Sequence, residues 1–226
     1  MSETTVDAGE PDPRAVAAER MTFFADAVIA IAITLLALEL PVPESADIRT
    51  NAQLWDALRE GRQEYLAFLI SFYVIAMHWA AHHRIFRYVT RLGRGMTLLS
   101  LLWLLTIVIT PFATKLLSTG DGAIQLRIGI YAGIQAVAGI VFLSMVLVIQ
   151  RQKLYRDDTP PHRFANAYWG AGAQAAGFLI SIPVSFFASD YAFDLWILAP
   201  IVTALARRRI DARRRRHPVD SSGDHL

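Results

Sequence analysis

The sequence contains no cysteine among its 226 residues. Disulfide bonds, thiolate metal sites and cysteine nucleophiles are therefore excluded. Charged residues make up only 19% of the chain, and only two of the 22 basic residues are lysines. A Gly-rich phosphate-binding loop, a nucleophile elbow and a pair of catalytic carboxylates are also missing from the sequence. We therefore do not expect an enzyme.

Although these motifs are missing, the sequence does contain long apolar blocks. Hydrophobic residues make up 54% of the chain. They fall in blocks of roughly 20 residues, the length that an α-helix needs to cross a hydrocarbon core of about 30 Å. The sequence predicts an all-α membrane protein with six transmembrane helices, at Met21–Leu40, Tyr65–Phe86, Met96–Leu116, Ile128–Ile149, Ala167–Ala188 and Tyr191–Ala206.

Three regions follow from the distribution of charge. Residues 1–19 form a net acidic tail without the basic start of a cleavable signal peptide, residues 20–208 form the transmembrane domain, and residues 209–226 form a basic tail. One side of the predicted membrane holds 17 of the 22 basic residues: Arg14 and Arg20, four arginines at residues 84–94, four basic residues at 151–163, and the seven arginines from Arg207 to Arg216. Because basic residues favour the cytosolic side, both termini are expected to be cytosolic.

Two segments outside the spans have patterns of their own. Within the first outer loop, Ala52–Glu64 places Leu54, Trp55 and Leu58 with the spacing of a short amphipathic helix at the membrane interface. The run Arg207–Arg216 is polybasic, which favours a cytosolic position and contact with anionic lipid. Beside a membrane helix we do not expect such a run to bind nucleic acid.

The first predicted helix carries two different faces. On a helical wheel, Ile31, Leu35 and Leu38 share one apolar face, with Thr34 at its edge and Phe24 one turn closer to the cytosol. A second face carries a carboxylate among small and apolar side chains, namely Asp26, Ala30, Ile33 and Ala37. A carboxylate inside a span is unfavourable by roughly 2.5–3.5 kcal/mol. We therefore expect the second face to contact protein, while the apolar face contacts lipid or another helix.

The second predicted helix carries a polar cluster close to its cytosolic end. The cluster contains His78, Trp79, His82 and His83, at the same depth as Arg20 and Asp26 on the first helix. A buried carboxylate needs hydrogen-bond donors, so we expect a structural network that joins Arg20 and Asp26 to this cluster. Two alternatives are a metal site at His78 and His82, which lacks a clear third ligand, and a proton relay through the histidines and Asp26.

These residues resemble a known family. The segment Arg20-x-x-x-Phe24-Ala25-Asp26, which opens the first helix, is similar to the Arg-x-x-x-Phe-Ser-Asp signature of the TMEM175 family of potassium channels. The run Trp79-Ala-Ala-His82-His83-Arg84-Ile-Phe86 also resembles that family. With six helices and one signature, the chain resembles the prokaryotic members, which have a single repeat. Ala25 stands where the signature has serine, which removes one hydroxyl group from the network.

The resemblance implies a homotetramer in a prokaryotic plasma membrane, with the first helix of each subunit lining a pore. It places an apolar constriction at Ile31, with Leu35 and Leu38 towards the outside and Thr34 at the edge, in place of a carbonyl filter. It assigns a supporting role to Arg20, Phe24 and Asp26 with the second-helix cluster. We thus expect a potassium-preferring channel without a cofactor or metal, in which K⁺ is the permeant ion.

Two further classes of protein remain as alternatives. One is a proton-conducting channel or a secondary transporter that uses Asp26 and the histidines of the second helix. The other is a scaffold that conducts nothing. Transporters tend to show internal repeats and broken helices, and no convincing repeat joins residues 20–116 to residues 127–206.

Overall fold

The computed structural model describes residues 12–44, 48–119 and 122–187, together with residues 195, 196, 198, 202 and 205. The regular elements of these residues are helices, at α1 (Pro13–Leu38), α2 (Asn51–Glu60), α3 (Arg62–Phe86), α4 (Met96–Ser118), α5 (Ile124–Arg151) and α6 (His162–Phe187). All but α2 are long and apolar enough to cross a membrane. The predicted all-α membrane fold is confirmed for five spans. The predicted sixth span, Tyr191–Ala206, lies mostly outside the described residues, which include positions 195, 196, 198, 202 and 205 of it.

Helix α1 begins earlier than the predicted span, within the segment expected to be a tail. Asp12 caps it, because the Asp12 carboxylate accepts a hydrogen bond from the Arg14 backbone N–H at 2.9 Å. Pro13 occupies the first helical position, where a backbone N–H has no partner to lose. At 1.5 Å per residue the 26 residues of α1 span about 39 Å, which exceeds a hydrocarbon core of about 30 Å. Helix α1 is therefore longer than a hydrocarbon core is thick.

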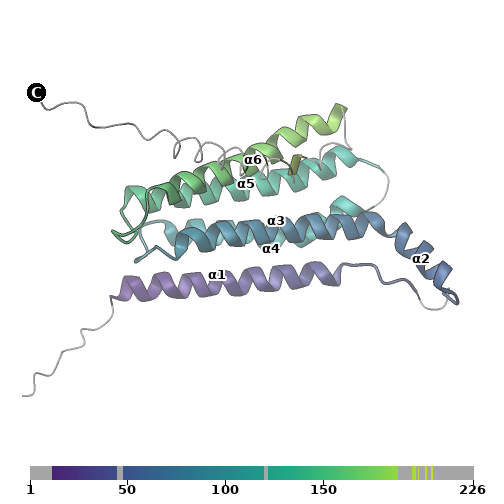
Figure 1. Ribbon diagram of the computed structural model, residues 1–226, viewed down its shortest axis with the longest axis horizontal. Helices are drawn as coiled ribbons and strands as arrows, with labels where there is room; N and C mark the ends of the chain where they lie inside the picture. The colour runs from purple at the N-terminus through teal and green to yellow at the C-terminus, as the bar shows by residue number, and fades with distance from the viewer. Residues whose placement is uncertain are drawn as a thin grey trace, which may run out of the picture.

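Helix α2 confirms that the first loop contains a short helix. Thr50 and Gln53 form a capping box, in which each side chain satisfies a backbone group at the other residue. Gly61 separates α2 from α3. Figure 1 shows α2 at one end of the helical bundle, beyond the body of α3.

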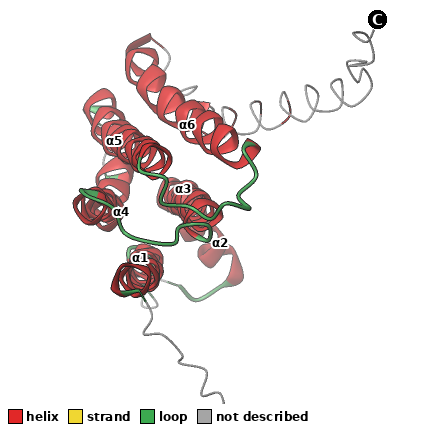
Figure 2. Ribbon diagram, turned by 90° about the vertical axis from the view of Figure 1, so that its left-hand side faces the viewer, coloured by secondary structure: helices red, strands yellow, loops and turns green. Residues whose placement is uncertain are grey.

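The spanning helices form layers, with α1 along one edge of the bundle. In Figure 1, α1 lies below α3 and α4, and α5 and α6 lie above them. Figure 2 looks along the helices and shows α1 beside α3 and α4, on the side away from α5 and α6. The core joins the layers through buried side chains of five helices, such as Ile29, Ile75, Trp103, Phe142 and Phe164. Of the described helices, α1 is thus held mainly along one side.

The connections at the end of the bundle where α1 begins are tied to one another. Val89 and Tyr155 form an isolated β-bridge between the α3–α4 and α5–α6 connections. The Thr90 N–H donates to the Leu154 carbonyl at 2.9 Å. The Leu92 N–H donates to the Arg14 carbonyl at 3.2 Å, so the first turn of α1 is attached to the same assembly.

Candidate functional site

The face of α1 that packs against the bundle is a narrow stripe of small and aliphatic side chains. Ala25, Ile29, Ala32 and Leu36 are almost completely buried, with exposed fractions of 0–2%. Their spacing of three and four residues follows one side of an α-helix. The two alanines allow close approach to α3 and α4, because a methyl group fills little space between helices.

The packed face differs from the one predicted from the sequence. Ala30 and Ala37 are exposed, while Asp26 and Ile33 are half-buried. The predicted face therefore lies at the margin of the contact rather than at its centre. The larger side chains of Ile29 and Leu36 provide more apolar contact area than alanine does, which favours the observed rotation of α1.

The apolar stripe of α1 points away from the rest of the chain. The exposed fractions are 59% for Ile31, 43% for Leu35 and 79% for Leu38. Phe24 is exposed as well, one or two turns closer to the start of the helix. The hydroxyl of Thr34 donates to the Ile31 carbonyl at 2.8 Å, so it is satisfied within α1. These predicted pore residues form an unpartnered surface within one chain.

A single hydrogen bond links the α1 carboxylate to α3. The indole N–H of Trp79 donates to Asp26 Oδ1 at 3.0 Å. His83, one turn further along α3, stacks on the Trp79 ring with 5.5 Å between ring centroids. Trp79, His83 and Asp26 therefore come together as predicted, at the edge of the α1–α3 contact.

The predicted contact between Arg20 and Asp26 is not formed. Among the described residues, no ion pair joins these two side chains, and Arg20 is exposed. Six residues at about 100° each place the two positions roughly 120° apart around α1. The two side chains therefore lie on different sides of the helix.

His78 and His82 also lie apart from Asp26, on the opposite side of α3. His78 Nε2 is 3.2 Å from Gln135 Oε1 of α5. His82 stacks between Phe86 and Trp103, with centroid distances of 3.8 and 4.8 Å. The sequence placed these histidines at the right depth, but a step of one residue turns a side chain by about 100°. Trp79 therefore faces α1, while His78 faces α5.

The interior of the bundle holds hydrogen-bonded side chains that the sequence analysis did not identify. Gln135 Nε2 donates to Thr110 Oγ1 at 3.0 Å, which extends the His78 contact to α4. Nearby, Thr114 Oγ1 donates to Ser71 Oγ at 2.7 Å, and Ser71 Oγ lies 3.0 Å from Tyr131 Oη. A glutamine within a span, and threonines four residues apart at 106, 110 and 114, are the signals that indicate such contacts.

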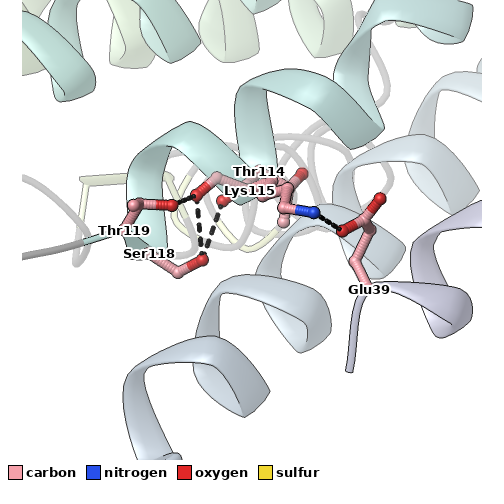
Figure 3. A network of polar contacts seen from close by, with 5 residues as sticks. All are labelled: Glu39, Thr114, Lys115, Ser118 and Thr119. Atoms are coloured by element: carbon pink, nitrogen blue, oxygen red, sulfur yellow. Dashed lines mark hydrogen bonds and ion pairs between the residues drawn. The ribbon is translucent and has the colours of Figure 1, made fainter. Parts of the chain in front are cut away.

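An ion pair holds the far end of α1. Figure 3 shows Lys115 of α4 reaching Glu39, the residue that caps the end of α1. The Lys115 Nζ to Glu39 Oε2 distance is 2.7 Å. The Lys115 backbone carbonyl accepts hydrogen bonds from Ser118 Oγ at 3.1 Å and Thr119 Oγ1 at 2.6 Å. The last turn of α4 is thereby ordered around the lysine that contacts α1.

A metal centre is not assembled in the part of the chain that the structure describes. No three His, Asp or Glu side chains gather there with the spacing of metal ligands. The two histidines considered from the sequence, His78 and His82, instead contact Gln135 and two aromatic rings. The arrangement therefore supports packing and positioning rather than metal chemistry.

Comparison with known proteins finds similarity to one family of channels. A family described as "Endosomal/lysosomal potassium channel TMEM175" matches residues 20–111, which include the Arg20–Asp26 segment and the α3 cluster. A protein of Streptomyces collinus described as a potassium channel is 33% identical over 56% of this chain and 61% of its own length. A protein of Gallus gallus described as the endosomal/lysosomal proton channel TMEM175 is 39% identical over 44% of this chain and 21% of its own length. The matches thus span less than two thirds of either relative.

A solved structure covers more of the fold. The crystal structure of a lysosomal potassium-selective channel TMEM175 homologue from Chamaesiphon minutus has a TM-score of 0.68 and 28% identity, and it covers 84% of this chain and 98% of that one. The family and these relatives are described as channels, not as enzymes. In its α1 signature, its helical fold and its relatives, this multi-pass membrane protein is similar to the TMEM175 channels.

Proposed function

We propose that the protein is a homotetrameric, potassium-preferring cation channel whose pore is lined by α1. One observation carries the proposal: α1 lies at the edge of the bundle and turns Ile31, Leu35 and Leu38 away from it. A spanning helix packed on one side only leaves its other side for lipid or for further copies of the chain. The description of the Streptomyces collinus relative as a potassium channel supports the second choice.

Several copies are needed because one helix cannot enclose a pore. Four chains around an axis bring four α1 helices together, and each contributes the same apolar stripe. Ile31 then forms the narrowest ring, with Leu35 and Leu38 towards the outside and Thr34 at the edge. Apolar rings of this kind gate by loss of water from the constriction.

The polar contacts of α1 then act as positioning contacts. Trp79 holds Asp26 on the packed side, and Lys115 holds Glu39 at the far end. Both contacts fix the rotation of α1 about its own axis, which decides whether Ile31 faces the pore. The excess of basic residues at one end of the bundle supports cytosolic termini in a prokaryotic plasma membrane.

Flux through liposomes tests the proposal. Purified protein in liposomes should carry current down a potassium gradient without any other substrate, with a reversal potential in mixed potassium and sodium that favours potassium. Ile31→Asn and Leu35→Asn should each change the current by about tenfold or more, because a polar side chain wets an apolar ring. Ile140→Asn is the matched control, because Ile140 lies on α5 with a similar exposed fraction, 50% against 59% for Ile31.

Two results contradict the pore assignment. The first is an unchanged current in both α1 variants. The second is a strictly monomeric mass of 25.2 kDa in mild detergent. For the proposed tetramer, native mass spectrometry should give about 101 kDa, four times the mass of the chain.

Proton conduction is the second candidate, favoured by the half-buried carboxylate of Asp26 and by the description of the Gallus gallus relative. In potassium-free liposomes loaded with a pH-sensitive dye, proton flux should then be measurable and should fall in Asp26→Asn. A transporter site at Asp26 receives less support, because His78 and His82 contact other partners.

A further inference from the structure

A basic cavity opens at the end of the bundle where α1 begins. Its volume is about 540 Å³. Arg14 lines it from the first turn of α1, and Arg91 and Arg94 line it from the connection between α3 and α4. Gln152 and Leu154 close it from the connection between α5 and α6. A cavity of this size accommodates a small ligand or a lipid headgroup, since ligand pockets occupy roughly 300–1,000 Å³.

The charge in this cavity is of one sign. Among the described residues, three arginines and no carboxylate line it. The ion pairs found in the described part of the chain involve other residues, so none neutralises Arg14, Arg91 or Arg94. Arg94 also lies two residues before the start of α4, whose N-terminus adds a partial positive charge. The three arginines therefore make the cavity attractive to an anion.

The walls of the cavity are held in a defined shape. The Gln152 side chain accepts a hydrogen bond from the Arg94 backbone N–H at 3.1 Å and donates one to the Arg94 carbonyl at 3.3 Å. The connections approach so closely that a Cβ at Gly93 would overlap Gln152 Oε1 and lie 2.6 Å from Leu154 Cδ1. The hydrogen bond from Leu92 to Arg14 fixes the third wall. The contacts of the backbone thus hold the three arginines close to one another.

The geometry points to a binding site for a phosphate group, carried by an anionic phospholipid, in the cavity between Arg14, Arg91 and Arg94. Guanidinium groups bind phosphate through paired, charge-assisted hydrogen bonds. The site lies at the ends of spanning helices, where lipid headgroups lie, and Leu92 and Leu154 provide apolar wall. Basic pockets between transmembrane helices bind anionic headgroups in this way. The described residues that line the site do not include those of α1's apolar stripe.

Ligand affinity in neutral detergent tests the site on the full chain. The probes are dioctanoyl phosphatidylglycerol, dioctanoyl phosphatidylcholine and inorganic phosphate, each titrated against the purified protein by thermophoresis. Phosphatidylglycerol should bind at least about tenfold more tightly than the other two probes. Arg91→Gln with Arg94→Gln should weaken its binding by about a hundredfold, because each lost guanidinium removes charge-assisted contacts worth a factor of about ten. Arg14→Gln should weaken it independently, from the side of α1.

The matched control is Arg49→Gln with Arg62→Gln, which removes two exposed arginines at the opposite end of the bundle. It should leave binding unchanged. Size-exclusion profiles and melting curves without ligand verify that each variant is folded, and Arg91→Lys with Arg94→Lys tests whether the fork of the guanidinium is needed beyond its charge. If inorganic phosphate binds as tightly as the lipid and depends on the same arginines, the phosphate site stands and its ligand is a free anion. Equal lipid binding by the wild type, the Arg91 and Arg94 variant and the control overturns the site, as does a wild type that binds neither phosphatidylglycerol nor inorganic phosphate.

Discussion

The Trp79 to Asp26 hydrogen bond is the residue-scale feature that connects α1 to α3. The sequence predicted that Asp26 would find donors on the second spanning helix, and it placed four candidate side chains at the right depth. Depth follows from counting along each helix, but the partner depends on how the two helices are rotated. That rotation is set by apolar contacts such as those of Ile29 and Leu36. The sequence therefore predicted the contact but did not single out Trp79.

Replacing Trp79 by phenylalanine tests this contact. The variant keeps an aromatic ring but removes the N–H that donates to Asp26 Oδ1. We expect a loss of about 1 kcal/mol in the free energy of unfolding, because a half-buried carboxylate loses a donor while water still reaches part of it. Thermal unfolding in detergent measures the effect, and Trp169→Phe, at an exposed indole of α6, is the control. A double-mutant cycle with Asp26→Asn should show coupling; purely additive effects would rule out the contact.

At the scale of helices, the five described spans were predicted closely, because apolar length is a property of the sequence alone. The start of α1 was placed too late, although Asp12 and Pro13 provide an ordinary helix start. The sequence did not show which of the small residues lie in contacts between helices. Gly139 meets Ala175, whereas a Cβ at Gly129, Gly133, Gly170 or Gly172 would meet nothing within 4 Å. The role of a glycine depends on the neighbouring helix, which a helical wheel does not contain.

The contrast between Gly139 and Gly133 of α5 gives a matched pair of substitutions. In Gly139→Ala the new Cβ would lie 2.8 Å from Ala175 Cβ, so α5 and α6 must move apart. We expect a loss of about 1–3 kcal/mol in stability. In Gly133→Ala the added methyl group meets open space, and the higher helix propensity of alanine should stabilise the protein by up to about 1 kcal/mol. Thermal unfolding compares the two, and Ala175→Gly should restore part of the stability lost in Gly139→Ala.

At the scale of the whole molecule, α1 is attached at both ends and along one side, while its apolar stripe is unpartnered. The Leu92 to Arg14 hydrogen bond holds its first turn, and the Lys115 to Glu39 ion pair holds its last. In the proposed tetramer, the ion pair lies at the outer mouth of the pore, repeated four times. Each Glu39 carboxylate there is offset by a lysine of the same chain.

The Glu39 and Lys115 charges should therefore set the conductance at low salt. A unit charge about 10 Å from an ion in water changes the energy of the ion by about 0.4 kcal/mol, a factor of about two in local concentration. Lys115→Gln should raise the potassium conductance by at least this factor, and Glu39→Gln should lower it. Both effects should nearly vanish at 1 M salt, where the screening length is about 3 Å.

Asp56→Asn provides the control for this pair of variants. Asp56 lies on α2 in an exposed ion pair with Arg59, away from the helix that lines the proposed pore. The conductance of the Asp56→Asn variant should match that of the wild type at every salt concentration. Salt-independent changes in Lys115→Gln would instead indicate that the lysine acts through the position of α1.

The distance along the chain between Asp26 and Trp79 also orders events during synthesis. The two residues are 53 positions apart, and α1 packs on α3 and α4, which the ribosome makes later. At about 5–20 residues per second, Asp26 is made roughly 3–10 seconds before its tryptophan partner. During that interval its carboxylate has no α3 to donate to it. Stable insertion of α1 is therefore completed only after α3 has been made and Trp79 can donate to Asp26.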